Sequence, residues 1–391
     1  MTTRKGGELG FSILELLIAV AIATVITGAV FAMLDPAHGA FRVQPESADV
    51  AQRLRAAADA VLRDVSAAGS QPVFAPGEPL PPVSVAAVFP YRIGRRNADP
   101  PGTFDTTRIS VWSVSPSAPQ ALLAAPLPSG SAVATIAPGG GCPPADPTCG
   151  FMAGTTVVVM SHSGALDLFT VTAVDGSLLS LDHNLADSAF VHAASATTLA
   201  EVIAQTYFLR TDPALGYAQL RRYDTGAGAD VPVVDHVVGL VFEYWGEADP
   251  PRMIDGAAPA RTTYGPLPPP TGVQWTAYPP GENCVFTRSP LGNVVPRLAQ
   301  WSAQPELVPL SAASLTDGPW CPDDASPNRY DADLLRVRQV VMTVRVEAAA
   351  DSVRGPAGRL FTRAGTARDG RWVPDRQLRL VVVPRALSRG R

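Results

Sequence analysis

The feature that most constrains this chain is an apolar stretch near its beginning, Phe11 to Leu34. It is 24 residues long, contains no proline and carries one charged side chain, Glu15. As a helix rising ~1.5 Å per residue it would be ~36 Å long, which exceeds the ~30 Å hydrocarbon core of a bilayer. We therefore expect a membrane-spanning helix, in which the Glu15 carboxylate costs roughly 2.5–3.5 kcal/mol unless it finds a partner.

The residues at the start of this stretch resemble the class III signal of type IV prepilins. Gly10 precedes Phe11, Glu15 is the fifth residue after the glycine, and a short polar leader carrying Arg4 and Lys5 lies ahead of them. The resemblance implies that a membrane aspartyl peptidase, the prepilin peptidase, cuts between Gly10 and Phe11 and methylates the new amino terminus. It also implies that Glu15 pairs with the Phe11 ammonium of a neighbouring subunit during assembly.

Two other interpretations of the apolar stretch stand beside this one. In an ordinary single-pass anchor, Glu15 would snorkel to the membrane interface. A secretory signal peptide would be cut after a small-residue site, for which residues 37–39 are a candidate, but its apolar core is usually about 7–15 residues long. The 24 residues from Phe11 to Leu34 favour a membrane span over a signal peptide.

Charge indicates on which side of the membrane the rest of the chain lies. Arg4 and Lys5 precede the apolar stretch and Asp35 follows it, so the positive-inside rule places the amino terminus in the cytoplasm and the bulk of the chain outside it. The resemblance implies the bacterial inner membrane and periplasm, and then a pilus or pseudopilus. The formal net charge of -4 argues against non-specific nucleic-acid binding, which needs a basic surface.

Four cysteines suggest disulfides in an oxidising compartment, with three possible pairings. Cys142 and Cys149 lie in a loop rich in proline and glycine, and Cys284 and Cys321 flank a second irregular region. We expect the two pairs that are nearest in sequence, Cys142–Cys149 and Cys284–Cys321. Zinc is disfavoured because the chain has no CxxC and no histidine at ligand spacing.

The order of apolar patterns predicts an α+β fold. Asp35–Pro36 is expected to interrupt the membrane helix, and an amphipathic helix is expected from about Pro45 to Ala68, ending at Gly69. From about Val83 onward, runs of β-branched and aromatic residues bounded by turn residues predict strands. The clearest of these late strands are Leu334–Glu347 and Leu378–Pro384.

This arrangement resembles the type IV pilin fold, in which a long N-terminal helix packs on a mostly antiparallel sheet. Within that family it is most similar to PilW-type minor pilins, or to the GspJ-type minor pseudopilins of type II secretion, through a valine-rich segment that ends in tyrosine before a variable insert. The implied organisation is a leader at 1–10, a transmembrane helix at 11–34, a soluble helical part at 35–69, a β-rich domain at 70–246, an insert at 247–330 and C-terminal strands of the same domain at 331–391.

The predicted insert is rich in proline and has little periodicity. Long ordered loops of this kind are usually functional. Three tryptophans lie in it, Trp275, Trp301 and Trp320. They tuck into the parent domain, or they form an aromatic contact surface for a ligand or a neighbouring pilin, or the insert is disordered.

No motif indicates catalysis, since the sequence lacks HExxH, GxSxG and a glycine-rich phosphate loop. We therefore expect neither an enzyme nor a cofactor. An acidic group near Cys321 is a weak candidate for a calcium site, because the EF-hand pattern is absent and a solvated acidic loop is the simpler interpretation. Its members are Asp323, Asp324, Asp331 and Asp333.

The resulting hypothesis is a minor pilin that is processed by prepilin peptidase and assembles through its N-terminal helix to prime or cap a filament. The implied partners are the peptidase, other minor and major pilins or pseudopilins, the inner-membrane assembly platform and membrane lipid. The alternatives are a minor pseudopilin of type II secretion, and a tip adhesin or DNA-uptake module that uses the tryptophan-rich insert. A membrane-anchored enzyme would need a pocket with convergent titratable groups.

Overall fold

The computed structural model describes residues 12–70, 86–248 and 306–384, and two short strands between 286 and 296. These ranges contain internal gaps, of which the longest are 185–196 and 354–365. The chain divides into two compact units. The first comprises Met1–Gln52 and Glu347–Arg376, and the second comprises Arg53–Val346 and Gln377–Arg391. Within the described residues the fold is α+β, and the strand pairs whose register is resolved are antiparallel.

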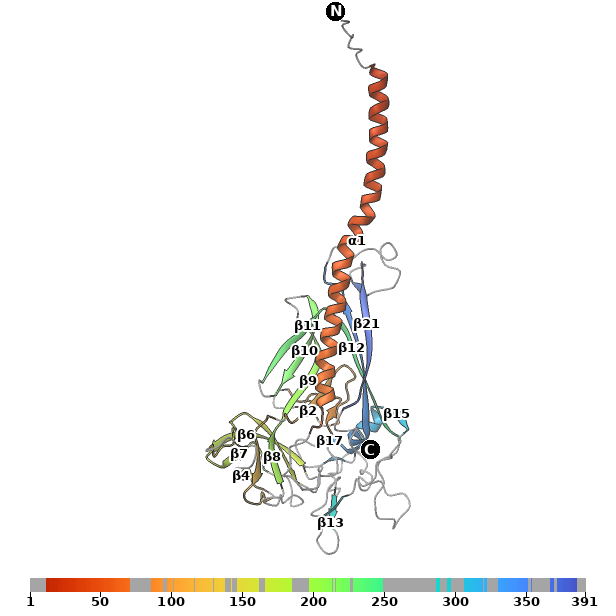
Figure 1. Ribbon diagram of the computed structural model, residues 1–391. Helices are drawn as coiled ribbons and strands as arrows, with labels where there is room; N and C mark the ends of the chain where they lie inside the picture. The colour runs from red at the N-terminus through yellow and green to blue at the C-terminus, as the bar shows by residue number, and fades with distance from the viewer. Residues whose placement is uncertain are drawn as a thin grey trace, which may run out of the picture. The chain divides into compact units, whose positions relative to one another are not determined.

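Helix α1 spans Ile13–Ala67 and is drawn in Figure 1 as one unbroken red coil. Its first part, Ile13–Met33, has a mean hydropathy of 2.5 and is long and apolar enough to cross a membrane. All of its side chains are exposed, including Ile13 at 79% and Met33 at 80%. An exposed apolar surface of this length is unfavourable in water, so its composition fits a lipid environment.

The expectation that Asp35–Pro36 interrupts the helix is wrong. The backbone is helical from Ile13 to Ala67, so the two helices predicted from the sequence are one element of 55 residues. A proline inside a helix removes one hydrogen bond and costs about 3 kcal/mol. Because long helical segments flank it on both sides, this single loss does not end α1.

The later part of α1 carries the predicted apolar stripe. Leu54, Ala57, Val61 and Val65 recur at three- or four-residue spacing, and all four are buried. The helix ends where Gly69 adopts a φ of 72°, a conformation that glycine takes without steric cost. The predicted amphipathic helix and its stop at Gly69 are therefore confirmed.

A five-stranded antiparallel sheet in the second unit has the order β1-β2-β9-β10-β11. The hydroxyl group of Tyr207, in the third of these strands, donates a hydrogen bond to the Asp64 carboxylate of α1. This partly buried contact fixes the end of the helix against the sheet. The strands are β1 (Val88–Phe89), β2 (Ile109–Ser113), β9 (Ile203–Asp212), β10 (Tyr217–Asp224) and β11 (Ala229–Asp235).

A closed barrel of six strands, which no local sequence pattern predicts, is inserted between β2 and β9. Ser113 at the end of β2 pairs with Ile203 at the start of β9, so the chain leaves and re-enters the sheet at facing residues. The barrel order is β3-β4-β7-β6-β5-β8, and Leu123, Phe169 and Leu199 are among its buried side chains. Its strands are β3 (Gln120–Leu123), β4 (Val133–Ala137), β5 (Thr156–Ser161), β6 (Leu166–Asp175), β7 (Leu178–Leu181) and β8 (Thr197–Glu201).

A four-stranded sheet has the order β15-β12-β18-β21. Its third strand begins at Val337, after a 3-10 helix η2 (Ala332–Arg336), and it confirms most of the strand predicted at Leu334–Glu347. Gly246 lies between β15 and β18, paired with Val308 on one side and Val337 on the other. The strands are β15 (Leu307–Leu310), β12 (Val237–Glu247), β18 (Val337–Glu347) and β21 (Asp375–Val382).

The remaining described elements are short. A 3-10 helix η1 covers Ala313–Leu315, and three two-stranded pairs complete the assignment. The pairs are β13 (Phe286–Arg288) with β14 (Val294–Pro296), β16 (Trp320–Cys321) with β17 (Tyr330–Asp331), and β19 (Thr366–Arg368) with β20 (Arg371–Val373). Most of the predicted insert at 247–330 lies outside the described residues.

Candidate functional site

The beginning of α1 is the part of the chain with the most specific sequence motif. Gly10 and Phe11 lie outside the described residues, while Ser12 and Glu15 are described. The Ser12 backbone N–H donates to Oε2 of Glu15 at 3.0 Å, and the Leu14 N–H donates to Oγ of Ser12 at 3.2 Å. The Leu16 N–H donates to the Ser12 carbonyl at 3.1 Å, which is the first hydrogen bond of the helix.

Glu15 therefore has a partner within its own chain. The side chains beside it along the helix, Leu14 and Leu16, are 66% and 61% exposed, so the carboxylate lies on an otherwise apolar exposed surface. A serine followed three residues later by a glutamate at a helix start is a capping box. This signal is present in the sequence as S-I-L-E, and neither the assembly role nor the snorkelling role expected for Glu15 includes it.

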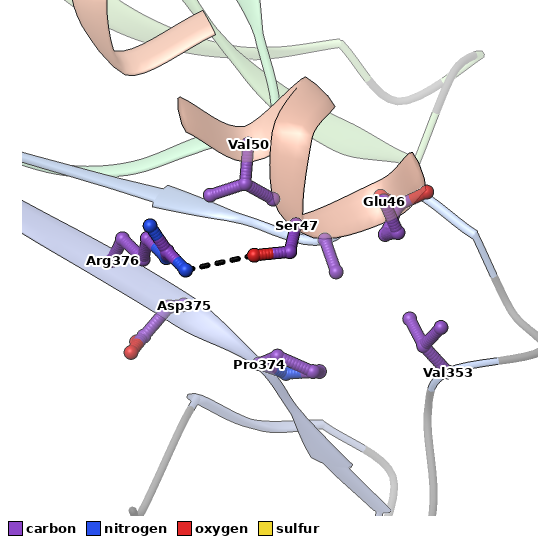
Figure 2. Close-up of a pocket in the computed structure, with 8 residues that line it drawn as sticks. Glu46, Ser47, Val50, Val353, Pro374, Asp375 and Arg376 are labelled. Carbon is purple, nitrogen blue, oxygen red and sulfur yellow. Dashed lines mark hydrogen bonds between the residues drawn. The ribbon is translucent and has the colours of Figure 1, made fainter. Parts of the chain in front are cut away.

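A cavity of about 250 Å³ lies in the first unit, between α1 and the segments around residues 348–353 and 374–376 (Figure 2). The Glu46 carboxylate accepts hydrogen bonds from the backbone N–H groups of Ala349 and Ala350, and Arg376 donates to Oγ of Ser47 at 2.7 Å. These contacts tie α1 to both segments. The cavity is lined by Glu46, Ser47, Val50, Ala348, Val353, Pro374, Asp375 and Arg376.

This cavity does not have the features of an active site. Ligand pockets usually have volumes of about 300–1,000 Å³ and a few polar groups that converge on the ligand. Here Glu46 and Arg376 bind other parts of the chain, and Val50, Val353 and Pro374 supply apolar walls. We interpret it as a packing gap beside the contacts that join α1 to these segments.

The acidic residues predicted as weak calcium candidates are only partly described. Asp323 and Asp324 lie outside the described residues, whereas Asp331 and Asp333 are buried and lie with Asp317 in a cluster whose carboxylate oxygens are within 4.8 Å of one another. The expectation of a solvated loop is therefore wrong for Asp331 and Asp333. Asp317 was not identified from the sequence because it lies well before this pair in the chain.

The chain itself already binds the two buried carboxylates. Asp331 accepts hydrogen bonds from the backbone N–H groups of Gly318 and Asp333, at 2.6 and 2.8 Å. Asp333 forms an ion pair with Arg336 at 3.2 Å. Calcium takes six to eight oxygen ligands, and three carboxylates with these prior partners are a poor match for that requirement. We assign no metal to the cluster.

Burial gives this cluster a predicted pH dependence. It raises the pKa of Asp331 from 3.8 to about 7, and that of Asp333 to about 6. Between pH 4 and 7 the folded chain therefore holds protons on these two carboxyls that the unfolded chain has released. Their contribution to the free energy of unfolding is fully present below pH 4, and it is lost as pH rises through 7. We expect the thermal midpoint of the full chain to fall from pH 5 to pH 8, and Asp331→Asn to flatten this slope. An unchanged slope in the variant would contradict the assignment to Asp331.

Cys142 and Cys149 are joined by a disulfide in the loop between β4 and β5, which is the pairing expected from the sequence. Asp146 organises this turn, since its carboxylate accepts the backbone N–H groups of Thr148 and Gly150 at 2.9 Å. Cys284 and the side chain of Cys321 lie outside the described residues, so the second pairing stays a prediction.

Of the three tryptophans in the predicted insert, Trp320 is described and packs against the parent domain. A Cβ atom added at Gly102, whose φ is 81°, would lie 2.7 Å from the Trp320 ring. The glycine is therefore needed both for its backbone conformation and for the close approach of the indole. Trp275 and Trp301 lie outside the described residues.

No family model matches this chain, and no curated protein matches it. We therefore infer a function from the chemistry at the start of α1 and from the elements that follow it.

Proposed function

We propose that this chain is a minor pilin of a type IV pilus, with a type IV pilin-like fold, which acts by assembly and not by catalysis. The observation that carries the proposal is the composition of helix α1. One continuous helix of 55 residues joins an exposed apolar part, with Glu15 in its first turn, to an amphipathic part with a buried stripe.

The length of α1 supports this proposal. At ~1.5 Å per residue, 55 residues extend ~82 Å, which is more than twice the ~30 Å core of a bilayer. The apolar part can reside in the inner membrane while the later part holds the folded domain. On assembly the same apolar surface can pack against the helices of other subunits without changing its conformation.

Glu15 gives this packing a register. After prepilin peptidase cuts between Gly10 and Phe11, the Phe11 ammonium of a staggered neighbour can pair with the Glu15 carboxylate. Each charge alone would be costly in apolar surroundings, and pairing reduces that cost. Apolar helices alone slide along one another with little preference, so the pair would fix the axial position of each subunit. The partners would be other minor and major pilins and the inner-membrane assembly platform.

The size of the second unit favours a position that is occupied once in the filament. The inserted six-stranded barrel adds bulk to the five-stranded sheet on which α1 packs. Such bulk would crowd neighbours in a repeated lattice, whereas an initiating or capping subunit has free space around it. A minor pseudopilin of type II secretion would use the same helix chemistry, and the pilins that copurify with the chain distinguish the two systems.

Processing provides the direct test of this proposal. We expect the mature chain to begin at N-methylated Phe11, because Gly10, Phe11 and Glu15 have the spacing of a prepilin signal. Intact-mass and N-terminal peptide analysis of the membrane-extracted protein measures this. A mature start near Ala40 would show instead that ordinary signal peptidase had acted, and an uncut chain would identify a simple membrane anchor.

A further inference from the structure

One sheet edge in the described part of this chain lacks the features that usually protect edges. An edge strand presents a row of unpaired backbone N–H and C=O groups, and proteins protect such rows by shortening the strand or by placing proline in it. The barrel is closed and has no edge. In the two larger sheets, β1 has two residues, β11 contains the exposed Pro232, and β15 has four residues including Pro309. The remaining edge, β21, has eight residues and no proline.

The outer side of β21 carries backbone groups that a further strand can bind. Among the described strands its neighbour in the sheet is β18, and Figure 1 shows β21 in blue at the margin of this sheet. Alternate residues of a strand bond to the same neighbour. The Pro374 carbonyl accepts the Ala348 N–H, just past the end of β18, at 2.8 Å. By this alternation the even-numbered residues of β21 face β18, and the backbone groups of Gln377, Arg379 and Val381 face the open edge.

The side chains along this edge are exposed and partly apolar. Val381 and Val383 are 54% and 49% exposed, and because they are two residues apart in extended backbone they lie on the same face. Arg379 shares that face and forms an ion pair with Glu243 at 3.0 Å, in which both side chains are about half exposed. An exposed pair of this kind is weak, so Arg379 can bind a second carboxylate.

Charge indicates which kind of strand this edge prefers. Residues 377–391 contain four arginines and no acidic residue, although the formal net charge of the whole chain is -4. Arg379 is one of them, and the other three follow β21 and lie outside the described residues. Opposite charges on neighbouring strands stabilise pairing, and like charges oppose it. The edge therefore favours an acidic strand, and it disfavours a second copy of β21, which would bring the same arginines.

We propose that β21 is a docking edge, at which an acidic, extended segment of a partner protein adds as a further strand to the sheet. The backbone of that segment pairs with Gln377, Arg379 and Val381, its apolar side chains cover Val381 and Val383, and a carboxylate binds Arg379. In such strand addition the main-chain hydrogen bonds supply affinity and the alternate side chains supply specificity. The inference does not rest on the proposed function, because it uses this sheet alone and not the apolar part of α1.

The test uses the full chain in detergent micelles and three synthetic peptides of about ten residues, the length of a long strand. In the acidic peptide, valine alternates with threonine and glutamate. The second peptide has arginine in place of glutamate, and the third is the acidic peptide with its central backbone nitrogens methylated, which removes the N–H donors. We expect fluorescence anisotropy to show about tenfold tighter binding of the acidic peptide than of either other peptide.

Two variants at position 381 locate the binding. Val381→Pro removes an N–H that faces the open edge, where an edge strand tolerates proline, and it should weaken binding of the acidic peptide about tenfold. Val381→Thr is the matched control, because it keeps the N–H and the branched shape, and its affinity should stay within about twofold of wild type. Hydrogen–deuterium exchange of the wild-type chain needs no variant: the acidic peptide should slow the Arg379 and Val381 amides about fivefold and leave the Leu380 amide unchanged.

Each outcome decides one part of the proposal. Equal affinity for all three peptides, or exchange at Arg379 and Val381 that the acidic peptide does not slow, would overturn the docking edge. Equal binding of the acidic and arginine peptides, with none of the methylated one, would refute the acidic partner. Sedimentation of the chain alone as a dimer that Val381→Pro dissociates would assign the edge to a second copy instead. Glu15→Ala should bind the acidic peptide like wild type, so a failure of the assembly mechanism and a failure of this edge are distinguishable.

Discussion

Replacing Glu15 with alanine is expected to lower incorporation into filaments strongly, while leaving the chain in the membrane and cleaved after Gly10. The apolar part of α1 remains, and losing a charge makes its insertion more favourable by roughly 2–3 kcal/mol. Under the proposed function cleavage should persist, because the change leaves the leader and Gly10 intact. Incorporation falls because the ammonium of a neighbour would then be left unpaired in the apolar core.

The loss of incorporation should be large, and it can be measured by copurification with partner pilins and by counting filaments. An unpaired charge in apolar surroundings costs more than 1.4 kcal/mol, so recovery of the chain with partner pilins should fall about tenfold or more. Filament number per cell should fall with it. Ile18→Ala, a change of similar size at an exposed site on the same helix, is the matched control, and Glu15→Asp should retain part of the function. Normal filaments with Glu15→Ala would reduce Glu15 to a snorkelling residue and refute the assembly mechanism.

The second large effect is expected from Gly246→Ala, in the strand between β15 and β18. A Cβ atom added at Gly246 would lie 2.3 Å from the carbonyl oxygen of Arg336 and 2.7 Å from Cδ1 of Leu310. The first of these neighbours is a backbone atom at the end of η2, so the clash can be relieved only by a backbone shift of β12 or of the end of η2. We expect the free energy of unfolding to fall by about 3 kcal/mol or more.

Gly239→Ala is the matched control because it lies in the same strand. Its added Cβ would approach the Cβ of Arg345 at 3.3 Å, a contact that a small shift can relieve. We expect it to cost about 1 kcal/mol or less. Thermal unfolding of the detergent-solubilised full chain, followed by circular dichroism, compares the two. Equal midpoints for the two variants would show that β12 accommodates a side chain at Gly246 and that the predicted clash is relieved locally.

Local patterns predicted the elements whose structure depends on local physics. The stripe from Leu54 to Val65 follows from helical periodicity, and the Cys142–Cys149 disulfide follows from sequence proximity. In the second half of β18, the alternation follows from the period of two, since Met342, Val344 and Val346 are buried while Thr343 and Arg345 are half-buried. Each of these features needs only a few neighbouring residues to specify it.

Features that depend on distant pairing were not predictable in the same way. Strand propensity predicts strands from about Val83 onward, but it does not say which strands are neighbours. The barrel closes through pairs such as β3 with β8. The approach of Asp317 to Asp331 likewise depends on tertiary packing. Pro36 was misjudged for a different reason, because the rule that proline ends a helix omits the stability of the flanking helical segments.

The pairing of Ser113 with Ile203 has a consequence for how this chain could have acquired its present size. Facing residues in an antiparallel pair have Cα atoms about 4.5–5.5 Å apart, a distance that a tight turn spans. The 89 residues between them can therefore be regarded as an interchangeable cassette, since removing them would leave two ends that a simple hairpin can join. A chain without the barrel could keep an uninterrupted β2–β9 hairpin, so the strand pairing of the sheet does not depend on the residues inserted into it.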